Sequence, residues 1–372
     1  MIKAEHLIII GSTNKHVREG GIPSYLNELE SYLNKNYNGY TLLEISETKY
    51  ETNYKKKYAT LNDNYFKRCW LLRKEIKKII KEKKKIVFSI HYWRELIFSL
   101  DIIIKKDFIL HFHGPAYLEA KLENKSKLHI LIAKCYERFV YPKAKYAVCL
   151  SQEFKNVLSQ LYNVKKEKIS VIPYGFQLNG IKQLVAPRNK KIKIICVRRL
   201  VKRVGVELLI RACKKLKDDG FEFELNIVGE GYLFHSLATL VKELDLNKHI
   251  NMLGRLSDGD LKTLLLQSDL AVMPSIALEG FGISTVECLY HGVPVIGTDI
   301  GGTTGILKPL HPNLMIEEPS SLKIYEKLSA ILSQSINLPT RKQCHDYAVK
   351  NYDIEKVGLQ IKALYHSASL VD

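Results

Sequence analysis

The sequence predicts an α/β protein built from two Rossmann-like, doubly wound domains that face each other across a cleft. Short β-rich apolar runs alternate with helical patterns along the whole chain, which is typical of parallel sheets covered by helices. The 372 residues exceed what one core usually accommodates, and a stretch of weak periodicity, 177–191, separates two such series. We therefore expect a first domain over 1–176, a linker over 177–191 and a second domain over 192–351, followed by a terminal helix.

Each expected strand is a short apolar run bounded by polar or turn-forming residues. The runs of the first half are Leu7–Ile10, Lys85–Ile90, Phe108–Phe112, Tyr146–Leu150 and Ile169–Ile172, and those of the second half are Lys193–Val197, Glu222–Val228, Ile250–Leu253, Leu270–Met273, Val293–Gly297 and Leu314–Ile316. Helical spacing of apolar residues predicts helices after Gly20-Gly21, over 205–217, 232–245, 258–267, 283–291 and 320–334, and in the terminal stretch Tyr352–Tyr365.

The formal net charge of +18 is concentrated in the first half, where residues 1–180 hold 32 basic and 18 acidic side chains. Its densest run is Arg73–Lys85, in which apolar residues share one helical face and lysines cover the rest. We expect this basic amphipathic helix, through Lys74, Lys77, Lys78 and Lys81, to meet an anionic membrane surface or an acceptor there. One alternative is that the lysines of this helix form an ordinary solvated outer face. Another is that the protein binds nucleic acid, although the run lacks interleaved aromatic residues and any recognition module.

Cysteine usage and hydropathy bear on the compartment. The seven cysteines are scattered without a C-x-x-C pair, so neither a zinc site nor a disulfide framework is indicated. The first ten residues hold too short an apolar core for a secretory signal, and no apolar run approaches the ~20 residues that span a bilayer. We expect a cytoplasmic protein associated peripherally with the inner face of the membrane.

Two elements of the first domain suggest contacts with a ligand, because in such domains ligands bind beyond the carboxyl ends of the strands. Gly20-Gly21 follows the first strand and opens a helix, where backbone N–H groups can receive a phosphate; a plain turn is the other interpretation. His113, followed by Gly114-Pro115, ends the strand Phe108–Phe112 and is the stronger candidate for a functional histidine. His91 and His111 are more readily explained as structural.

The most specific pattern lies in the second domain, directly after the strand Leu270–Met273. Gly280 and Gly282 form a tight loop into a helix, with Glu279 in the loop and Glu287 about one turn inside the helix. A helix N-terminus favours a diphosphate, and a carboxylate nearby can accept hydrogen bonds from a ribose diol. The alternative for Glu287 is capping or pairing with a lysine.

Glu279 and Glu287 resemble the E-x7-E signature of the retaining glycosyltransferases of family 4, which have two Rossmann-like domains (the GT-B fold). The resemblance extends in order over nearly the whole chain. Its further matches are Gly20-Gly21, His91, His113-Gly114-Pro115, Ser151, Val171-Ile172-Pro173 with Gly175, Val197–Gly205, Val228–Gly231, Leu253-Gly254, Asp269–Ser275, Val295–Gly302 and the helix over Tyr352–Tyr365. It implies a sugar transfer from a nucleotide-diphosphate sugar, UDP- or GDP-linked, to a lipid-linked or saccharide acceptor of a surface polysaccharide. It also implies that the terminal helix, within 352–372, crosses back onto the first domain.

The same resemblance assigns the site residues. His113 and Glu279 would be catalytic, with His113 contacting the sugar. Donor binding would fall to Gly20, Gly21, Arg199, Arg203, Gly229, Glu279, Gly280, Phe281, Gly282, Ile283, Ser284 and Glu287. No metal and no further cofactor are expected, since arginines and backbone amides can neutralise the departing diphosphate.

Three positions depart from the family pattern. Val204 stands where the G-R-L-x-x-x-K-G element has its lysine, so we expect Arg203 or Lys202 to complete the cationic site. Gln177 replaces the acid of P-x-G-x-D, and Gly305 replaces the glutamate of G-G-x-x-E. A non-catalytic descendant that binds nucleotide sugars without turnover is therefore an alternative to the enzyme.

Overall fold

The computed structural model describes residues 6–13, 21–37, 39–46, 54–83, 85–91, 93–178 and 191–370, leaving aside the side chains of 369 and 370. The chain forms two compact units. Unit 1 contains the chain up to Gln177, apart from Lys121–Asn124, together with the segment from Asp353. Unit 2 consists of Leu178–Tyr352 and Lys121–Asn124. Gly20 and residues 179–190 of the expected linker lie outside the described residues.

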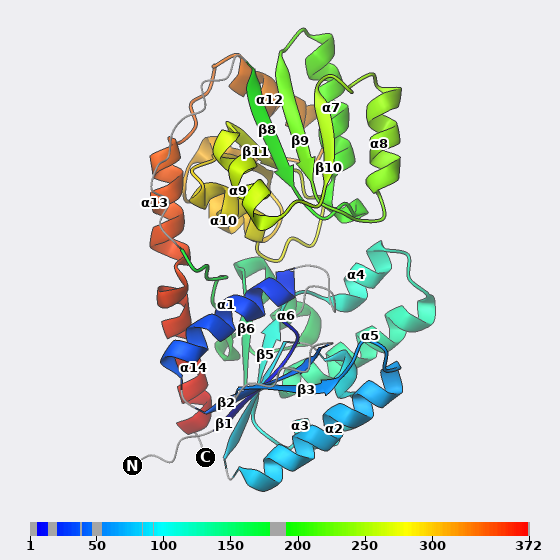
Figure 1. Ribbon diagram of the computed structural model, residues 1–372, viewed down its shortest axis with the longest axis vertical. Helices are drawn as coiled ribbons and strands as arrows, with labels where there is room; N and C mark the ends of the chain where they lie inside the picture. Colours follow the sequence, from blue (N-terminus) through cyan, green and yellow to red (C-terminus); the bar gives the residue numbers. More distant parts are fainter. Residues whose placement is uncertain are drawn as a thin grey trace. The chain divides into compact units, whose positions relative to one another are not determined.

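Unit 1 is built on a parallel sheet of seven strands in the order β3-β2-β1-β4-β5-β6-β7. Its strands are β1 (His6–Ile10), β2 (Tyr40–Ile45), β3 (Lys55–Ala59), β4 (Ile86–Ile90), β5 (Phe108–Phe112), β6 (Tyr146–Cys149) and β7 (Ile169–Val171). Its helices are α1 (Gly21–Asn36), α2 (Tyr65–Glu82), η1 (Arg94–Ser99), α3 (Leu100–Ile103), α4 (Ala116–Leu122), α5 (Lys127–Val140), η2 (Tyr141–Lys143), α6 (Gln152–Tyr162), η3 (Lys166–Lys168) and α14 (Ile354–Leu370). Figure 1 shows these strands with helices on both sides.

Unit 2 is built on a second parallel sheet, of six strands, in the order β10-β9-β8-β11-β12-β13. Its strands are β8 (Ile192–Val197), β9 (Phe223–Val228), β10 (Ile250–Gly254), β11 (Leu270–Met273), β12 (Val295–Thr298) and β13 (Met315–Ile316). Its helices are η4 (Lys202–Val204), α7 (Val206–Asp218), α8 (Phe234–Glu243), α9 (Asp258–Gln267), α10 (Ile283–Tyr290), α11 (Gly302–Leu307), η5 (Pro312–Leu314), α12 (Ser321–Leu332) and α13 (Arg341–Tyr352). The predicted fold class, two doubly wound parallel α/β domains, is confirmed.

The C-terminal helix α14 belongs to unit 1 although it follows all of unit 2 in sequence. The Ile354 amide donates to the Phe176 carbonyl at 2.9 Å, just before the helix begins. A Cβ at Gly358 would lie 2.5 Å from the Tyr32 ring of α1, so only glycine permits this close approach of the two helices. Figure 1 shows α1 and α14 side by side.

Two strands of unit 1, β2 and β3, were not expected from the sequence. Every residue of β2 is buried, because this strand pairs with β1 on one side and β3 on the other. β3 begins with three lysines and lies at the edge of the sheet, where charged side chains discourage pairing with another chain. Its composition therefore hides it from a search for apolar runs.

Candidate functional site

The candidate donor site of unit 2 begins with the loop that joins β11 to α10. Gly282 precedes the helix with φ of +96°, a left-handed conformation that favours glycine. A Cβ there would lie 2.9 Å from the hydroxyl oxygens of both Thr285 and Thr303. The backbone of this turn therefore requires the glycine that the sequence pattern singled out, and the first amides of α10 point toward the loop as a potential anion site.

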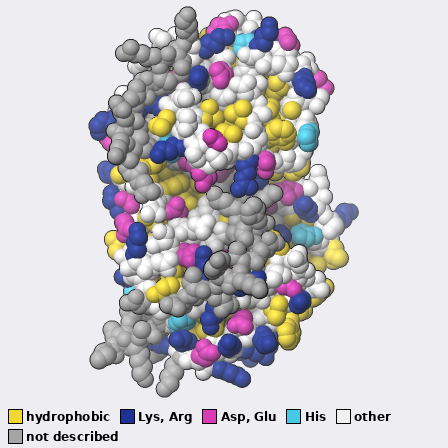
Figure 2. All heavy atoms as spheres, viewed as in Figure 1, with side chains coloured by type: hydrophobic (Ala, Val, Ile, Leu, Met, Phe, Trp, Pro, Cys, Tyr) yellow, Lys and Arg dark blue, Asp and Glu magenta, His cyan; other side chains and the backbone are white. Residues whose placement is uncertain are grey.

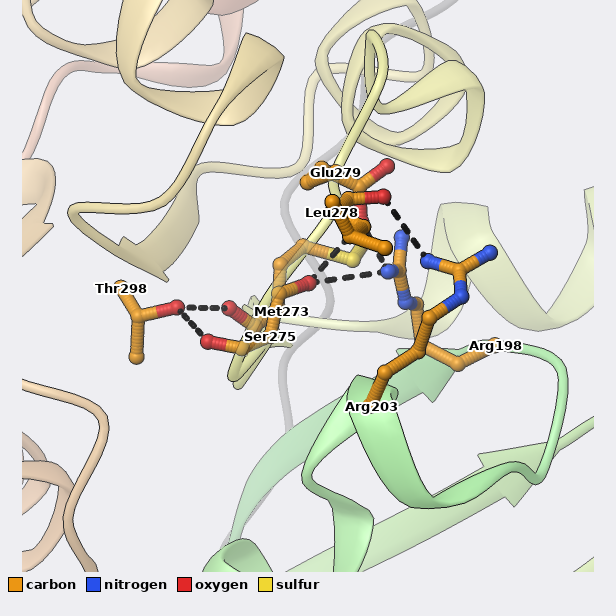
Figure 3. A network of polar contacts seen from close by, with 7 residues as sticks. All are labelled: Arg198, Arg203, Met273, Ser275, Leu278, Glu279 and Thr298. Carbon is orange, nitrogen blue, oxygen red and sulfur yellow. Dashed lines mark hydrogen bonds and ion pairs between the residues drawn. The ribbon is translucent and has the colours of Figure 1, made fainter. Parts of the chain in front are cut away.

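Glu279 lies in this loop as part of a buried three-way contact (Figure 3). Its Oε2 accepts from Nη2 of Arg198 and, at 2.9 Å, from the hydroxyl of Ser275. Arg198 also reaches the Ser275 oxygen at 2.9 Å. The side chains of Arg198 and Glu279 are only 8% and 9% exposed, so this is an ion pair shielded from water.

The charge state of Glu279 follows from these neighbours. Burial would raise its pKa, but Arg198, with help from Arg203 and Ser275, more than offsets burial and holds the pKa of Glu279 below its ordinary value. Glu279 is thus an ionised carboxylate in a dry environment. Among the described residues, its second oxygen, Oε1, has no hydrogen-bond partner and is left for a further donor such as a sugar hydroxyl.

The segment after β8 is bonded directly to this loop. Arg203 donates to the Leu278 carbonyl at 3.0 Å, and its own carbonyl accepts from the Ile276 amide at 2.8 Å. A Cβ at Gly205 would approach the Pro274 carbonyl oxygen to 2.0 Å. Figure 3 shows Arg198 and Arg203 extending from the neighbouring backbone toward Leu278 and Glu279. The segment after β8, with its arginines, is therefore held directly against the loop that contains Glu279.

The remaining predicted donor residues of unit 2 surround this loop less closely. Phe281 is buried and contacts the Tyr352 ring, with 5.6 Å between centroids. Gly229 follows β9, where a Cβ would lie 2.0 Å from the Arg198 carbonyl oxygen. Gly280, Ile283, Ser284 and Glu287 are partly exposed around the start of α10, and Arg199, two residues after β8, is partly exposed as well.

The lysine position of the family element is filled by an apolar side chain. Val204 is only 2% exposed and lies in the core of unit 2. The structure brings Arg203 to the loop in its neighbourhood but shows no bond of Lys202 to that loop among the described residues. The buried cation is provided by Arg198, which was not selected from the sequence because the family pattern points to Arg199. The position of Arg198 directly before Arg199 was the one sequence feature that could have indicated it.

In unit 1 the structure gathers the histidines that follow two adjacent strands. β4 and β5 pair in parallel, so His91 after β4 and His113 after β5 emerge at the same end of the sheet. Nδ1 of His91 lies 3.2 Å from Nε2 of His113. His111, within β5, stacks on His91 with 3.9 Å between ring centroids. His91 and His111, given less weight from the sequence, are thus part of the same cluster as His113.

Gly21 and Tyr25 place α1 beside this cluster. Gly21 is the first residue of α1, and it is exposed. Tyr25, one turn further along, meets the His113 ring edge-on at 5.2 Å. Tyr25 could not be selected from the sequence, because an aromatic residue on the inner face of a helix is usually a core residue.

The four lysines of α2 lie at the surface, as expected. Lys74, Lys77, Lys78 and Lys81 are exposed, while Cys69, Leu72, Ile76 and Ile79 are buried against the sheet. Figure 2 shows dark blue side chains gathered along the lower edge of the molecule, where Figure 1 places α2. No helix within the described ranges is long and apolar enough to cross a membrane.

Large apolar side chains are exposed close to these lysines. Phe66 and Trp70 of α2 are 67% and 56% exposed, and Phe98 of η1 stacks on Phe66 with 6.2 Å between centroids. The ammonium of Lys74 lies 5.7 Å from the Trp70 ring. On α5, Leu128, Leu131, Ile132 and Phe139 are exposed at helical spacing. The sequence analysis assigned no role to these residues, because exposure of an apolar side chain depends on tertiary packing and leaves no local pattern.

Two parallel α/β units, one with a glycine-bounded helix N-terminus flanked by carboxylates, define a protein of the GT-B class. The chain belongs to the group 1, family 4 glycosyltransferases. Residues 20–179 match the model of Glycosyltransferase Family 4, and residues 181–351 match that of Glycosyl transferases group 1. The resemblance found in the sequence is confirmed.

Individual relatives are distant. The chain is 24% identical over 208 residues to the putative colanic acid biosynthesis glycosyltransferase WcaL of Escherichia coli K12, covering 54% of this chain and 51% of that protein. It is 26% identical over 270 residues to an Escherichia coli UDP-Gal:alpha-D-GlcNAc-diphosphoundecaprenol alpha-1,3-galactosyltransferase, covering 68% and 67%. The matches to WcaL and to several other relatives thus span about half of those proteins or less.

A solved structure shows the same fold at low identity. Anabaena HepE in complex with UDP-glucose superposes with a TM-score of 0.74 at 16% identity, covering 97% of this chain and 99% of that one.

Proposed function

We propose that the protein is a retaining glycosyltransferase that transfers a sugar from a nucleotide-diphosphate sugar to a lipid-linked or saccharide acceptor in surface-polysaccharide biosynthesis. The observation that carries this is the loop before α10, where Glu279 is buried, ionised and held by Arg198 while one of its oxygens stays available. A carboxylate fixed in this way is suited to bind a neutral sugar hydroxyl with defined geometry.

The predicted donor residues of unit 2 each have a role in this proposal. Glu287, inside α10, accepts hydrogen bonds from the nucleotide ribose. The amides of Ile283 and Ser284, at the positive end of the helix, hold the diphosphate. Glu279 receives a hydroxyl of the donor sugar. Phe281 and the glycines Gly280, Gly282 and Gly229 keep the backbone in the shape that these contacts require.

The leaving diphosphate needs compensation of its charge. Arg199, partly exposed, is the direct candidate, and Arg203 acts from the segment bonded to the same loop. With these cations and the helix amides, transfer proceeds without a metal, and losing one such contact typically costs ~3–4 kcal/mol of transition-state stabilisation. His113 contacts the donor sugar and Gly21 approaches the diphosphate. The leaving phosphate oxygen deprotonates the acceptor on the same face of the sugar, which keeps the anomeric configuration.

Two relatives support a uridine nucleotide as the first donor to test. One carries UDP-Gal and a diphosphoundecaprenol acceptor in its name, and HepE was solved with UDP-glucose. A GDP-sugar is the second choice. The colanic acid assignment of WcaL supports an extracellular polysaccharide as the destination of the sugar.

A lipid-linked acceptor is consistent with the surface of α2. Basic residues near an anionic bilayer contribute ~1 kcal/mol each, and Lys74, Lys77, Lys78 and Lys81 all face outward. The exposed Phe66 and Trp70 supply apolar area that lysines alone lack. We propose that the protein works in the cytoplasm, on the inner face of the membrane, with this surface toward the lipid.

The first experiment screens UDP- and GDP-sugars for thermal stabilisation and then measures turnover with the donor that binds. Glu279→Gln is expected to bind the donor and lose turnover, because the amide no longer compensates Arg198 with a full charge. Glu287→Ala is expected to lose nucleotide affinity. Glu317→Ala, which removes a carboxylate elsewhere in unit 2, serves as the control.

Two results would redirect the proposal. Nucleotide-sugar binding without turnover for any donor and acceptor supports the non-catalytic alternative. Sequence-preferring binding of oligonucleotides, with no binding to anionic vesicles across a salt series, supports the nucleic-acid alternative. Unchanged turnover in both glutamate variants would rule out the assigned site.

A further inference from the structure

Glu137 is a fully buried carboxyl group in unit 1, on the inner face of α5, with an exposed fraction of 0%. Within the part of the chain that the structure describes, no cation forms an ion pair with it, and each of its partners is a hydrogen-bond donor. Removing a carboxyl group from water is unfavourable unless such partners replace the water. Burial raises the pKa of Glu137 to about 7, and its donors limit this rise.

Two of the donors are tyrosine hydroxyls. The Tyr162 hydroxyl of α6 donates to Oε2 of Glu137 at 2.7 Å, and the Tyr141 hydroxyl of η2 donates to Oε1 at 3.3 Å. Burial, reinforced by the neighbouring carboxylate, raises the pKa of both phenols well above the ordinary value. Both phenols therefore keep their protons and donate. The two oxygens of Glu137 are thus tied to α6 and η2.

The other two donors are backbone amides at the beginning of α4. The Ala116 N–H donates to Oε1 of Glu137 at 2.8 Å, and the Tyr117 N–H bonds to the same carboxylate. The first amides of a helix have no acceptor within that helix, so an external oxygen has to satisfy them. Glu137 caps α4 in this way, although it belongs to α5 and lies 21 positions further along the chain.

The capped helix begins directly after His113. Only Gly114 and Pro115 separate His113 from the Ala116 amide. Pro115 has a fixed φ, and its carbonyl accepts from two amides of α4 at 3.0 Å, so it moves with that helix. Gly114 has φ of +145°, a conformation that other residues rarely adopt. The backbone therefore has one flexible residue, Gly114, between His113 and the anchored helix.

The same cluster holds the residue on the other side of His113. Phe112, the last residue of β5, meets the Tyr141 ring edge-on at 5.7 Å and the Tyr162 ring edge-on at 6.0 Å between centroids. These are the two tyrosines whose hydroxyls donate to Glu137. The backbone is thus fixed to one buried cluster both before and after His113, by ring contacts on one side and by amide hydrogen bonds on the other.

We propose that Glu137 is a positioning residue for His113 and acts by anchoring the turn Gly114-Pro115-Ala116. The consequence for sugar transfer rests on the proposed function, whereas the placement of His113 does not. Glu137 itself is fully buried and touches no substrate. It sets where the imidazole lies, and displacing an aligned group by about 1 Å is enough to slow a reaction by roughly a hundredfold.

Other contacts of His113 limit the size of the expected effect. Its Nε2 lies 3.2 Å from Nδ1 of His91, and its ring meets the Tyr25 ring at 5.2 Å between centroids. Loss of the anchor should therefore displace His113 only in part. We expect Glu137→Ala to lower kcat about tenfold, with little change in the KM for the nucleotide sugar, because the nucleotide is bound by unit 2 in the proposed function.

A conservative substitution separates positioning from simple stabilisation. Glu137→Gln keeps one carbonyl oxygen for the Ala116 amide, while its NH₂ group faces a tyrosine oxygen that is able to accept. It should restore most of the kcat that Glu137→Ala loses, leaving about a two- to threefold deficit at about pH 8, where most of Glu137 is ionised. Tyr162→Phe removes one bond that orients the carboxylate and keeps the ring, so it should give a deficit of similar size.

The placement of His113 can be followed without any substrate. In ¹H–¹³C spectra of the full chain labelled in histidine, His113→Asn assigns the His113 ring signals. Glu137→Gln and Tyr162→Phe are both expected to shift these signals, and Glu137→Ala to shift them further. The two milder variants keep the test decisive if Glu137→Ala does not fold.

Leu43→Ala is the control for a loss of stability. Leu43 is fully buried in unit 1 on β2, which β1 and β4 separate from β5. Its truncation leaves a cavity in the same core and should lower the melting temperature. The His113 signals and kcat are expected to remain as in the wild type.

The outcomes separate this inference from the proposed function. His113 signals unchanged in both Glu137→Gln and Tyr162→Phe, or shifted as much in Leu43→Ala, overturn the inference whatever the activity. Shifted signals, together with no turnover of any sugar nucleotide by the wild type, support the placement of His113 while contradicting the proposed function. Shifted signals with an unchanged kcat overturn the link between this anchor and transfer.

Discussion

Removing the positive charge of Arg198 should destabilise unit 2 more than any substitution of a surface arginine. The Arg198 and Glu279 side chains are 8% and 9% exposed, so Arg198→Met leaves a carboxylate buried without its partner. Breaking a buried pair in this way typically costs ~3–5 kcal/mol in the free energy of unfolding. At ~2–4 °C per kcal/mol for a domain of this size, the melting temperature of unit 2 should fall by about 10 °C.

A double-mutant cycle tests whether this loss comes from the pair. Glu279→Gln leaves Arg198 charged and buried, and should also destabilise the unit. The double variant removes both charges and should cost less than the sum of the single variants, because neither charge is left alone. The assay is calorimetry or urea unfolding. The control is Arg211→Met, whose ion pair with Glu207 is about half exposed on both sides and should contribute ~0–1 kcal/mol.

The pH dependence provides an independent check on the same pair. Because the pKa of Glu279 is held below its ordinary value of 4.5, the pair's contribution is complete above that value and is lost as the pH falls through the folded-state pKa. In Arg198→Met, burial is opposed only by the smaller effects of Arg203 and Ser275, so the loss of stability on the acid side should shrink. Additive single variants, or an Arg198→Met loss no larger than that of Arg211→Met, would refute the reasoning.

Three further predictions concern other parts of the molecule. Gly282→Ala should lower both stability and nucleotide-sugar affinity, measured by thermal shift and calorimetric titration, because φ of +96° and the two threonine hydroxyls leave no room for Cβ; unchanged affinity would contradict it. Replacing Lys74, Lys77, Lys78 and Lys81 by Gln should weaken binding to anionic vesicles by ~1 kcal/mol per charge, measured by cosedimentation, and should leave binding to neutral vesicles unchanged. Equal binding of the wild type and the variant to anionic vesicles would argue against a membrane-facing α2. Burial raises the pKa of Glu137 to about 7, so the folded state binds this proton more tightly than the unfolded state does. The free energy of unfolding should therefore decline as the pH rises from about 4.5 to about 7. Glu137→Gln should abolish this pH dependence in unfolding measurements.

The fold could be predicted from the sequence because most of its strands are apolar, and β1, β4, β5, β9 and β11 are followed at once by glycine, histidine or proline. Phe108–Phe112 and Leu270–Met273 have the predicted bounds in the structure, and most other strand ends differ by one or two residues. The strand β3 escaped because three of its five residues are lysines. The helix α13 escaped because its residues, rich in charge, give almost no apolar face.

The site could be predicted only where it is local in sequence. Glu279, Gly282 and Glu287 belong to one loop and helix, so their spacing alone suggested a common role. The partner of Glu279 is Arg198, 81 positions away, and Nε2 of His111 meets the hydroxyl of Tyr365, 254 positions away. Such pairings depend on strand order, which brings β8 next to β11 and α14 beside the sheet of unit 1, and strand order leaves no local pattern.

The departures from the family pattern acquire a physical explanation in this light. The element G-R-L-x-x-x-K-G has its lysine at Val204, which is buried here, and its first glycine at Arg198, which pairs with Glu279. The segment has thus lost a cation at one end and gained one at the other. A buried arginine directed at Glu279 fixes that carboxylate, whereas charge on the leaving diphosphate must be met by Arg199 or Arg203. A protein rebuilt in this way should therefore depend more steeply on Arg199 than one that keeps the lysine: Arg199→Ala should lower kcat by about 10²- to 10³-fold while Arg211→Ala leaves it unchanged, and equal kcat values would show that the diphosphate is neutralised elsewhere.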